Sequence, residues 1–181
     1  DIGIARVSAT DLRPLGDIEL AEGSIVSAYV TAGGGQVWAV VGNGQLTRID
    51  RRTAEVTGTV DVGQGASGLT AGFGALWVAD DLTGTITPVD METLQPGTPI
   101  AIPGDIDDLE AGAGAVWSLD TDAGVVTPID PDTGALDSPV RVGVRPTDLA
   151  SGLDALWVTN NGDGTISKID PVTSNVQTFE I

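Results

Sequence analysis

The sequence predicts an all-β protein built from repeats of one four-stranded unit, and two observations lead to this fold class. First, its four tryptophans lie 39, 40 and 40 residues apart in the apolar phrases VWAV, LWVA, VWSL and LWVT: Trp38, Trp77, Trp117 and Trp157. Second, four glycines that follow the tryptophans are spaced by 40 residues each time: Gly44, Gly84, Gly124 and Gly164. A fixed period of this length indicates stacked copies of one supersecondary unit. We expect one domain, 1–181, with complete units at 23–65, 66–105, 106–145 and 146–181.

The first strand of each unit ends in a small-residue phrase: Val30–Gly33, Leu69–Gly72, Leu109–Gly112 and Leu149–Gly152. Two residues later comes a glycine or, in the last unit, Asp154. Glycine and aspartate tolerate positive φ, so a tight hairpin is predicted at each place. Small side chains also suit a strand that lies close to a crowded central axis.

The second strand carries the tryptophan, and in one unit the run Ala75–Ala79 is apolar at every position. Such a run predicts a sheet that is covered on both faces. The glycine that follows closes a hairpin into the third strand, and Asn43-Gly44 and Asp163-Gly164 are strong hairpin signals.

The third strand alternates between apolar and polar residues, and Pro88 and Pro128 within it indicate positions without a ladder donor, or a bulge. It closes with an aspartate that is followed three residues later by a threonine: Asp50, Asp90, Asp130 and Asp170. Aspartate at the first position of a type I turn bonds its own downstream backbone, so these four residues are interpreted as structural. The fourth strand has the least regular sequence, as expected for an outer strand.

Residues 1–22 form half a unit, because Ile4–Val7 resembles a third strand and Leu15–Leu20 a fourth. Four-stranded antiparallel units arranged radially make a β-propeller, in which each tryptophan would lie between adjacent blades. The fold prediction is therefore four complete blades of about 40 residues plus an N-terminal half blade. Since this number does not close one of the larger common rings, we expect a part of a larger propeller, or else a five-unit ring with one thin blade.

The stretch Leu156–Asp170, LWVTNNGDGTISKID, resembles the YVTN-type propeller repeat, and the blades also resemble those of virginiamycin B lyase-like propellers. The first resemblance implies a surface or secreted protein. The second would imply a lyase that uses a metal and a histidine base. This chain contains no histidine, so that chemistry does not transfer to it.

The charge balance is strongly acidic, with 8 basic and 26 acidic residues and a net charge of −18. Such a surface repels phosphate, which excludes nucleic acid and an anionic membrane surface as expected partners. The absence of cysteine and histidine removes thiolate sites and the commonest general base. No apolar run long enough to span a bilayer is present, so we expect no membrane insertion by this segment.

Acidic and amide side chains recur at the turns after the second strand and at the connections into the next first strand. Propeller geometry puts these turns and connections on one rim. The candidate binding residues are Asp80, Asp81, Asp105, Asp107, Asp108, Glu110, Asp120, Asp122, Asn160, Asn161 and Asp163. Hard cations prefer such oxygen ligands, so Ca²⁺ or a cationic partner is a hypothesis here, against the alternative of a solvated acidic surface. Glu110 lies inside a first strand and could face the central channel.

Three functions follow from these patterns. The first is a non-enzymatic binding or sensor scaffold in the extracellular space or cell envelope, whose rim holds a protein, peptide or glycan. The second is a propeller-type metal-dependent lyase or a hydrolase using carboxylates such as Asp107 and Glu110; no catalytic residue is assigned. The third is a purely structural module that assembles with remaining propeller blades or with itself.

Overall fold

The computed structural model describes residues 2–7, 14–21, 28–41 and 44–181, and in these ranges the protein contains strands and turns only. An N-terminal hairpin, β1 (Ile2–Val7) and β2 (Pro14–Ala21), precedes four antiparallel sheets. Asn43, part of the predicted Asn43-Gly44 hairpin signal, and residues 8–13 and 22–27 lie outside the described residues. The predicted half blade and four complete blades are therefore confirmed.

Each sheet has four strands in consecutive order. Blade 1 contains β3 (Ala28–Gly33), β4 (Gln36–Val41), β5 (Gln45–Asp50) and β6 (Val56–Asp61). Blade 2 contains β7 (Ala66–Gly72), β8 (Ala75–Asp80), β9 (Thr85–Asp90) and β10 (Ile100–Ala101). Blade 3 contains β11 (Asp108–Gly112), β12 (Ala115–Asp120), β13 (Val125–Ile129) and β14 (Val140–Arg141). Blade 4 contains β15 (Pro146–Gly152), β16 (Ala155–Asn160), β17 (Thr165–Ile169) and β18 (Val176–Glu180).

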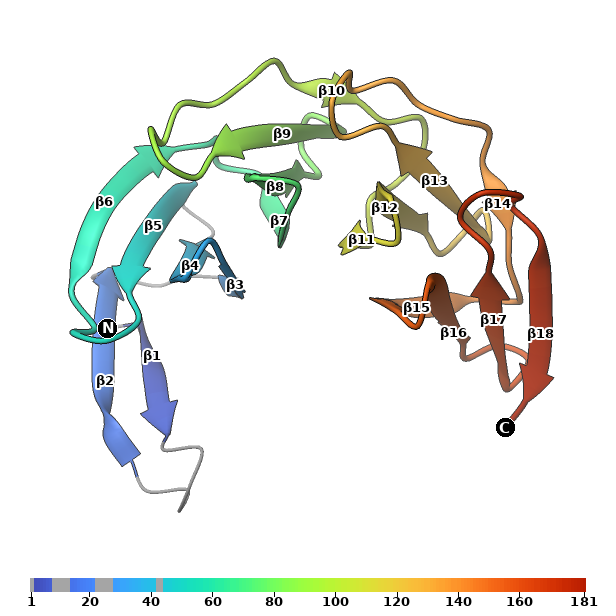
Figure 1. Cartoon of the computed structure of the whole chain (residues 1–181), viewed down its shortest axis with the longest axis horizontal. Coiled ribbons are helices and arrows are strands. Elements are labelled where there is room, and N and C mark those ends of the chain that lie inside the picture. Colours follow the sequence, from blue (N-terminus) through green and yellow to red (C-terminus); the bar gives the residue numbers. More distant parts are fainter. Residues whose placement is uncertain (1, 8–13, 22–27, 42–43) are drawn as a thin grey trace.

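The blades fan around an axis to form an open arc rather than a closed five-unit ring (Figure 1). The first strands β3, β7, β11 and β15 line the inside of the arc, and the fourth strands lie outside (Figure 1). Neighbouring first strands contact one another from β3 through β7 and β11 to β15. The hairpin β1–β2 and blade 4 stand at the two ends of the arc (Figure 1).

Small residues on the first strands permit this close approach. A Cβ added at Gly72 would lie 2.7 Å from the Cβ of Ala111, and one at Gly112 would lie within 2.4 Å of the Cβ of Ser151. Both distances are shorter than van der Waals contact allows. Crowding at the axis therefore requires glycine at the end of the interior first strands.

The hydrophobic core lies between blades. Trp38 packs with Leu76 and Val78 of blade 2, and Trp77 packs with Leu109 and Val116 of blade 3. Trp117 packs in the same way with residues of blade 4. All three tryptophans are at most 2% exposed. Blade 4 is the last sheet of the arc, so Trp157 has no further blade against it in the described structure and is half-buried.

The outer strands are short in blades 2 and 3, where β10 and β14 have two residues each. Pro88 and Pro128 stand in the adjacent third strands, where they have no amide hydrogen to donate to the ladder. Their carbonyls accept bonds from Gly97 N at 2.7 Å and Asp137 N at 2.9 Å instead. Pairing between the third and fourth strands resumes only in the two residues of β10 and the two residues of β14. This short ladder is what the two prolines predict.

Candidate functional site

The rim that carries the predicted acids consists of the turns after the second strands and the connections into the next first strands, and we call it the acidic rim. These two kinds of segment meet in the structure as predicted. Asp81 N donates to Gly65 O at 3.0 Å, and Asn161 N donates to Arg145 O at 3.0 Å. A backbone hydrogen bond therefore joins turn to connection in blades 2 and 4.

Asp80, Asp120 and Asn160 occupy the same position in blades 2, 3 and 4, and the side chain of each bonds to a neighbouring turn, connection or strand. Asp80 Oδ1 accepts from Thr83 N at 3.0 Å, and Asp120 Oδ1 accepts from Ala123 N at 2.7 Å. Asn160, 1% exposed, accepts from Gly143 N at 3.1 Å and donates to Thr165 Oγ1 and Ser167 Oγ. These side chains hold the rim together and present little free surface to a ligand.

Glycine is required at the turn that these side chains stabilise. Gly44, Gly84, Gly124 and Gly164 have φ values of +83°, +64°, +66° and +67°, which favour glycine. At Gly44 a Cβ would also collide with the carbonyl of Gly63. The repeated glycine is thus explained by turn geometry.

Two more rim carboxylates accept hydrogen bonds from backbone amides. Asp107 Oδ2 accepts from Thr121 N at 2.7 Å, and Asp163 Oδ2 accepts from Val144 N at 2.8 Å. A bond from the Thr165 hydroxyl, together with the one from Val144 N, lowers the pKa of Asp163. Both carboxylates are exposed and keep an open side toward solvent.

Asp81, Asp105, Asp122 and Asn161 are exposed, and within the described chain none of their side chains has a hydrogen-bond partner that the structure records. A shallow hollow of about 310 Å³ connects Asp81, Asp105 and Asp107. These residues form the accessible part of the acidic rim.

Asp108 and Glu110 lie on β11, and their carboxylates accept hydrogen bonds from blade 4. Asp108 Oδ2 accepts from Leu149 N at 2.9 Å, while Glu110 Oε1 accepts from Ser151 N at 3.0 Å and from Ser151 Oγ at 2.6 Å. Burial is the main reason that the pKa of Asp108 is raised. The corresponding bond between blades 2 and 3 joins Thr70 Oγ1 and Ala111 N at 3.2 Å. The predicted hydrolytic carboxylates Asp107 and Glu110 are thus engaged with separate backbone segments.

Among the residues that the structure describes, no group of three acidic side chains is placed to hold a metal ion. The rim carboxylates are distributed along the arc over blades 2, 3 and 4. A hard cation needs several oxygens converging at about 2.3–2.6 Å. The Ca²⁺ hypothesis thus finds no preformed cluster in this part of the chain.

The four aspartates at the ends of the third strands shape the turns on the opposite rim. Each Oδ1 accepts from the backbone amides two and three residues later; for Asp90 these are Glu92 N at 3.0 Å and Thr93 N at 2.7 Å. Such bonds, led by the one from the following threonine amide, lower the pKa of Asp50, Asp90, Asp130 and Asp170.

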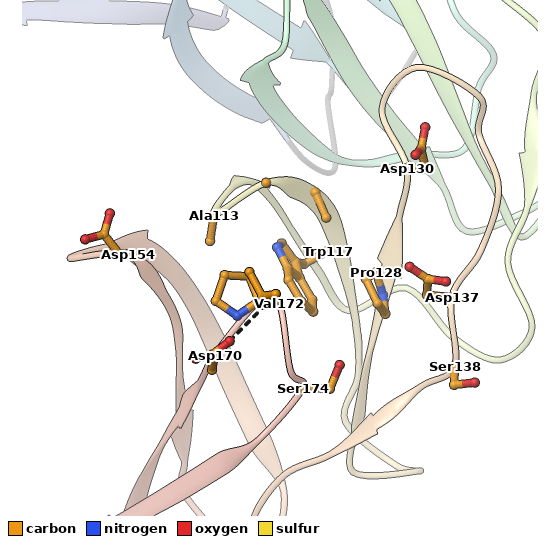
Figure 2. A pocket seen from close by; sticks show the side chains of 13 residues that line it. Ala113, Trp117, Pro128, Asp130, Asp137, Ser138, Asp154, Asp170, Val172 and Ser174 are labelled. Carbon is orange, nitrogen blue, oxygen red and sulfur yellow. Dashed lines mark hydrogen bonds between the residues drawn. The ribbon is translucent and has the colours of Figure 1, made fainter.

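The opposite rim also contains a groove that the sequence reasoning missed. It lies between blades 3 and 4, has a volume of about 880 Å³, and has Trp117 and Pro128 in its wall (Figure 2). Asp130, Asp137 and Asp154 surround it (Figure 2). Aligning the four units by third strand would have shown the signal, because Arg48 of blade 1 is replaced by Pro88 and Pro128, and blade 3 alone also carries an acid, Asp137, in place of Thr57.

The fold defines the class of the protein as a β-propeller. Among solved structures, the chain resembles hydrazine synthase of Kuenenia stuttgartiensis, with a TM-score of 0.73 and 16% identity over 84% of this chain and 48% of that chain. It also resembles a streptogramin B lyase, with a TM-score of 0.59 and 14% identity over 84% of this chain and 67% of that chain. A third similar structure is a chain of the mitotic checkpoint complex, with a TM-score of 0.78 and 15% identity over 98% of this chain and 59% of that chain.

These likenesses show the fold alone, because the identities are low. The chain spans about half the length of the hydrazine synthase chain that it matches. No protein-family model matches the sequence, and no curated relative is detected. No helix that could cross a bilayer occurs in the described ranges.

Proposed function

We propose that this protein is a non-enzymatic binding scaffold whose acidic rim holds a basic protein or peptide. The observation that carries the proposal is the set of exposed acids Asp81, Asp105 and Asp122, whose side chains have no recorded hydrogen-bond partner among the described residues. With a net charge of −18, the chain attracts cationic partners over several ångströms. Propellers that serve protein assembly are represented among the similar structures by the mitotic checkpoint complex.

The proposal places the protein in the extracellular space or the cell envelope. The support is its acidic composition together with the resemblance of Leu156–Asp170 to YVTN-type repeats of surface proteins. A role as an enzyme is disfavoured, because the chain has no histidine and the paired carboxylates that could hydrolyse a substrate bond backbone amides.

A binding experiment with a defined basic probe tests the rim. A capped hexalysine peptide should bind the wild-type protein, and the triple variant Asp81→Asn, Asp105→Asn, Asp122→Asn should weaken binding at least about tenfold. The matched control neutralises three exposed acids elsewhere, Glu55, Glu92 and Glu180, as glutamines. Equal loss in both triple variants would mean that only net charge matters, and the rim proposal would fail.

A second candidate function is assembly with further blades or with another copy. The observation in its favour is the outer face of blade 4, where Trp157 is half-buried and Phe179 is 45% exposed. Sedimentation of the chain at several concentrations tests it. A defined oligomer that dissociates on Trp157→Ala would support assembly, whereas a monomer at all concentrations would exclude self-association.

A further inference from the structure

The groove between blades 3 and 4 is the largest of three equivalent grooves on the opposite rim. The corresponding groove between blades 1 and 2 has a volume of about 460 Å³, and that between blades 2 and 3 about 370 Å³, against about 880 Å³ here. All three lie beside a buried tryptophan of the preceding blade. The difference in volume must therefore come from the side chains around the tryptophan.

The groove between blades 1 and 2 is occupied by the protein's own guanidinium group. Arg48 stands beside Trp38 in the ladder of β4 and β5. Its Nη1 donates to the carbonyls of Met91 at 3.4 Å and Glu92 at 3.2 Å, both on blade 2. Its Nε donates to Thr57 Oγ1 at 3.1 Å, and Nη2 donates to Thr57 O at 3.3 Å.

The groove between blades 3 and 4 keeps the acceptor positions and lacks the donor. Two repeats, or 80 residues, after Arg48 stands Pro128, which pairs with Trp117 as Arg48 pairs with Trp38. The positions of Met91 and Glu92 are taken by Pro171 and Val172, which line the groove and retain their backbone carbonyls.

The acceptor hydroxyl of Thr57 corresponds to the carboxylate of Asp137, again 80 residues later. Asp137 is exposed and lines the groove, as does Asp154 from the hairpin of blade 4. Neither carboxylate has a hydrogen-bond partner recorded among the described residues. The site that holds a guanidinium in blade 1 is thus more acidic in blade 3 and has no cation of its own at the position of Arg48.

Two further substitutions keep this groove open. Between blades 1 and 2, Leu94 reaches over Gly58, where a Cβ would lie 2.5 Å from Leu94 Cδ1. The residues 80 positions later are Ser138 and Ser174, which are short and exposed. Ser138 and Ser174 lie on opposite sides of the opening (Figure 2). The leucine that reaches over the groove between blades 1 and 2 therefore has only a serine at its counterpart position here.

We propose that this groove binds an arginine side chain of a partner protein or peptide. The guanidinium would take the place that Arg48 takes between blades 1 and 2, with the carbonyls of Pro171 and Val172 and the carboxylate of Asp137 as acceptors. Arginine fits because its planar fork carries five donors and bonds a carboxylate with two parallel hydrogen bonds. Lysine offers a compact charge without that geometry. This inference goes beyond the proposed function, because it concerns the other rim and one specific side chain.

Peptide titrations test the chemistry. Capped Gly-Arg-Gly should shift the backbone amide resonances of Asp137 and Val172 in an NMR titration, and it should bind at least about tenfold more tightly than capped Gly-Lys-Gly. The citrulline counterpart, which keeps the shape and loses the charge, should not bind. Equal affinity of the arginine and lysine peptides would overturn the proposal.

A variant that refills the groove tests the location. Pro128→Arg combined with Asp137→Thr recreates the residues found between blades 1 and 2, so it should abolish peptide binding and raise the melting temperature. If that variant does not fold, Asp137→Asn alone should weaken arginine binding at least about fivefold. Asp132→Asn, a change at an exposed acid on the neighbouring turn, is the matched control and should bind as the wild type does. Binding that survives Asp137→Asn, or is lost only in the acidic-rim triple variant, would refute the groove as the arginine site.

Discussion

The three interior interfaces and the end face of blade 4 each present a tryptophan held by the same hydrogen bond, but they differ in how far that tryptophan is buried. The indole N–H of every tryptophan donates to a glycine carbonyl five residues earlier, at 3.0, 3.2, 3.0 and 3.0 Å. The ring orientation is thus set within each sheet. Trp38, Trp77 and Trp117 are buried by the next blade, whereas Trp157 lies at the end of the arc beside Phe179, with ring centroids 6.3 Å apart.

This contrast separates what a blade does alone from what its neighbour adds. The hairpins and the indole hydrogen bond are made within one blade, whereas full burial of the tryptophan occurs only where a next blade covers it. In blade 4 the missing cover over Trp157 is replaced only in part by Lys168, whose Nζ lies 5.5 Å from the centre of the indole ring. Arg48, the corresponding residue of blade 1, instead reaches across to blade 2.

The largest effect should come from the tryptophans themselves. Trp117→Ala should lower the free energy of unfolding by about 3–5 kcal/mol, because it leaves a cavity between two blades. Trp157→Ala should cost less than about half of that, since its ring already contacts water. Urea unfolding followed by circular dichroism measures both. Equal losses would mean that the neighbouring blade contributes little to burial.

Close packing of first strands gives the next effect. Gly112→Ala should cost about 1–3 kcal/mol, because the new methyl group collides with Ser151 on the adjacent strand. Gly152→Ala is the matched control at the end of the arc, where a Cβ meets nothing within 4 Å. Thermal melts of the two variants should therefore diverge, and a neutral Gly112→Ala would contradict the close approach of β11 and β15.

The bridging arginine should have a smaller effect. Arg48→Met removes four hydrogen bonds at the interface of blades 1 and 2. Because these bonds are partly exposed, we expect a loss of about 1 kcal/mol. Lys168→Met, the equivalent change on the end blade, should be close to neutral by the same urea titration. A larger loss for Lys168 than for Arg48 would reverse the comparison.

The smallest effect concerns pH. Burial raises the pKa of Asp108 above the usual 3.8, so the folded protein keeps this proton at pH values where the unfolded chain has lost it. The resulting contribution to stability is present below about pH 3.8 and is lost as the pH rises through the raised pKa. Asp108→Asn should flatten this part of the stability curve, whereas the exposed control Asp154→Asn should leave it unchanged. A curve unaltered by Asp108→Asn would show that its ionisation is not linked to folding.

Much of the fold was predictable because its signals are local. The period of the tryptophans predicts the units, glycines with positive φ mark the hairpins, and Asp-x-x-Thr marks the turns after the third strands. Each of these depends on a few residues close together in the sequence. The half blade at 1–22 was predictable for the same reason, since Ile4–Val7 repeats the pattern of a third strand.

The candidate site was less predictable. Acids could be assigned to one rim from topology, but the sequence does not show that Asp80 and Asp120 bond amides of their own turns, or that Asn160 bonds the amide of Gly143 in the preceding connection. Nor does it show that Glu110 reaches Ser151, 41 residues away. Such roles depend on distances between segments that only packing sets.

The amino-acid sequence by itself determined that this chain forms four and a half repeats of an antiparallel four-stranded sheet, because hairpins and turns are encoded by neighbouring residues. The tertiary structure decided which carboxylates remain free, that Trp157 is less buried than its three equivalents, and that a groove opens between blades 3 and 4. The physical reason is that burial and hydrogen-bond satisfaction depend on what the next blade presents, and residues about 40 or 80 positions apart in the chain supply it.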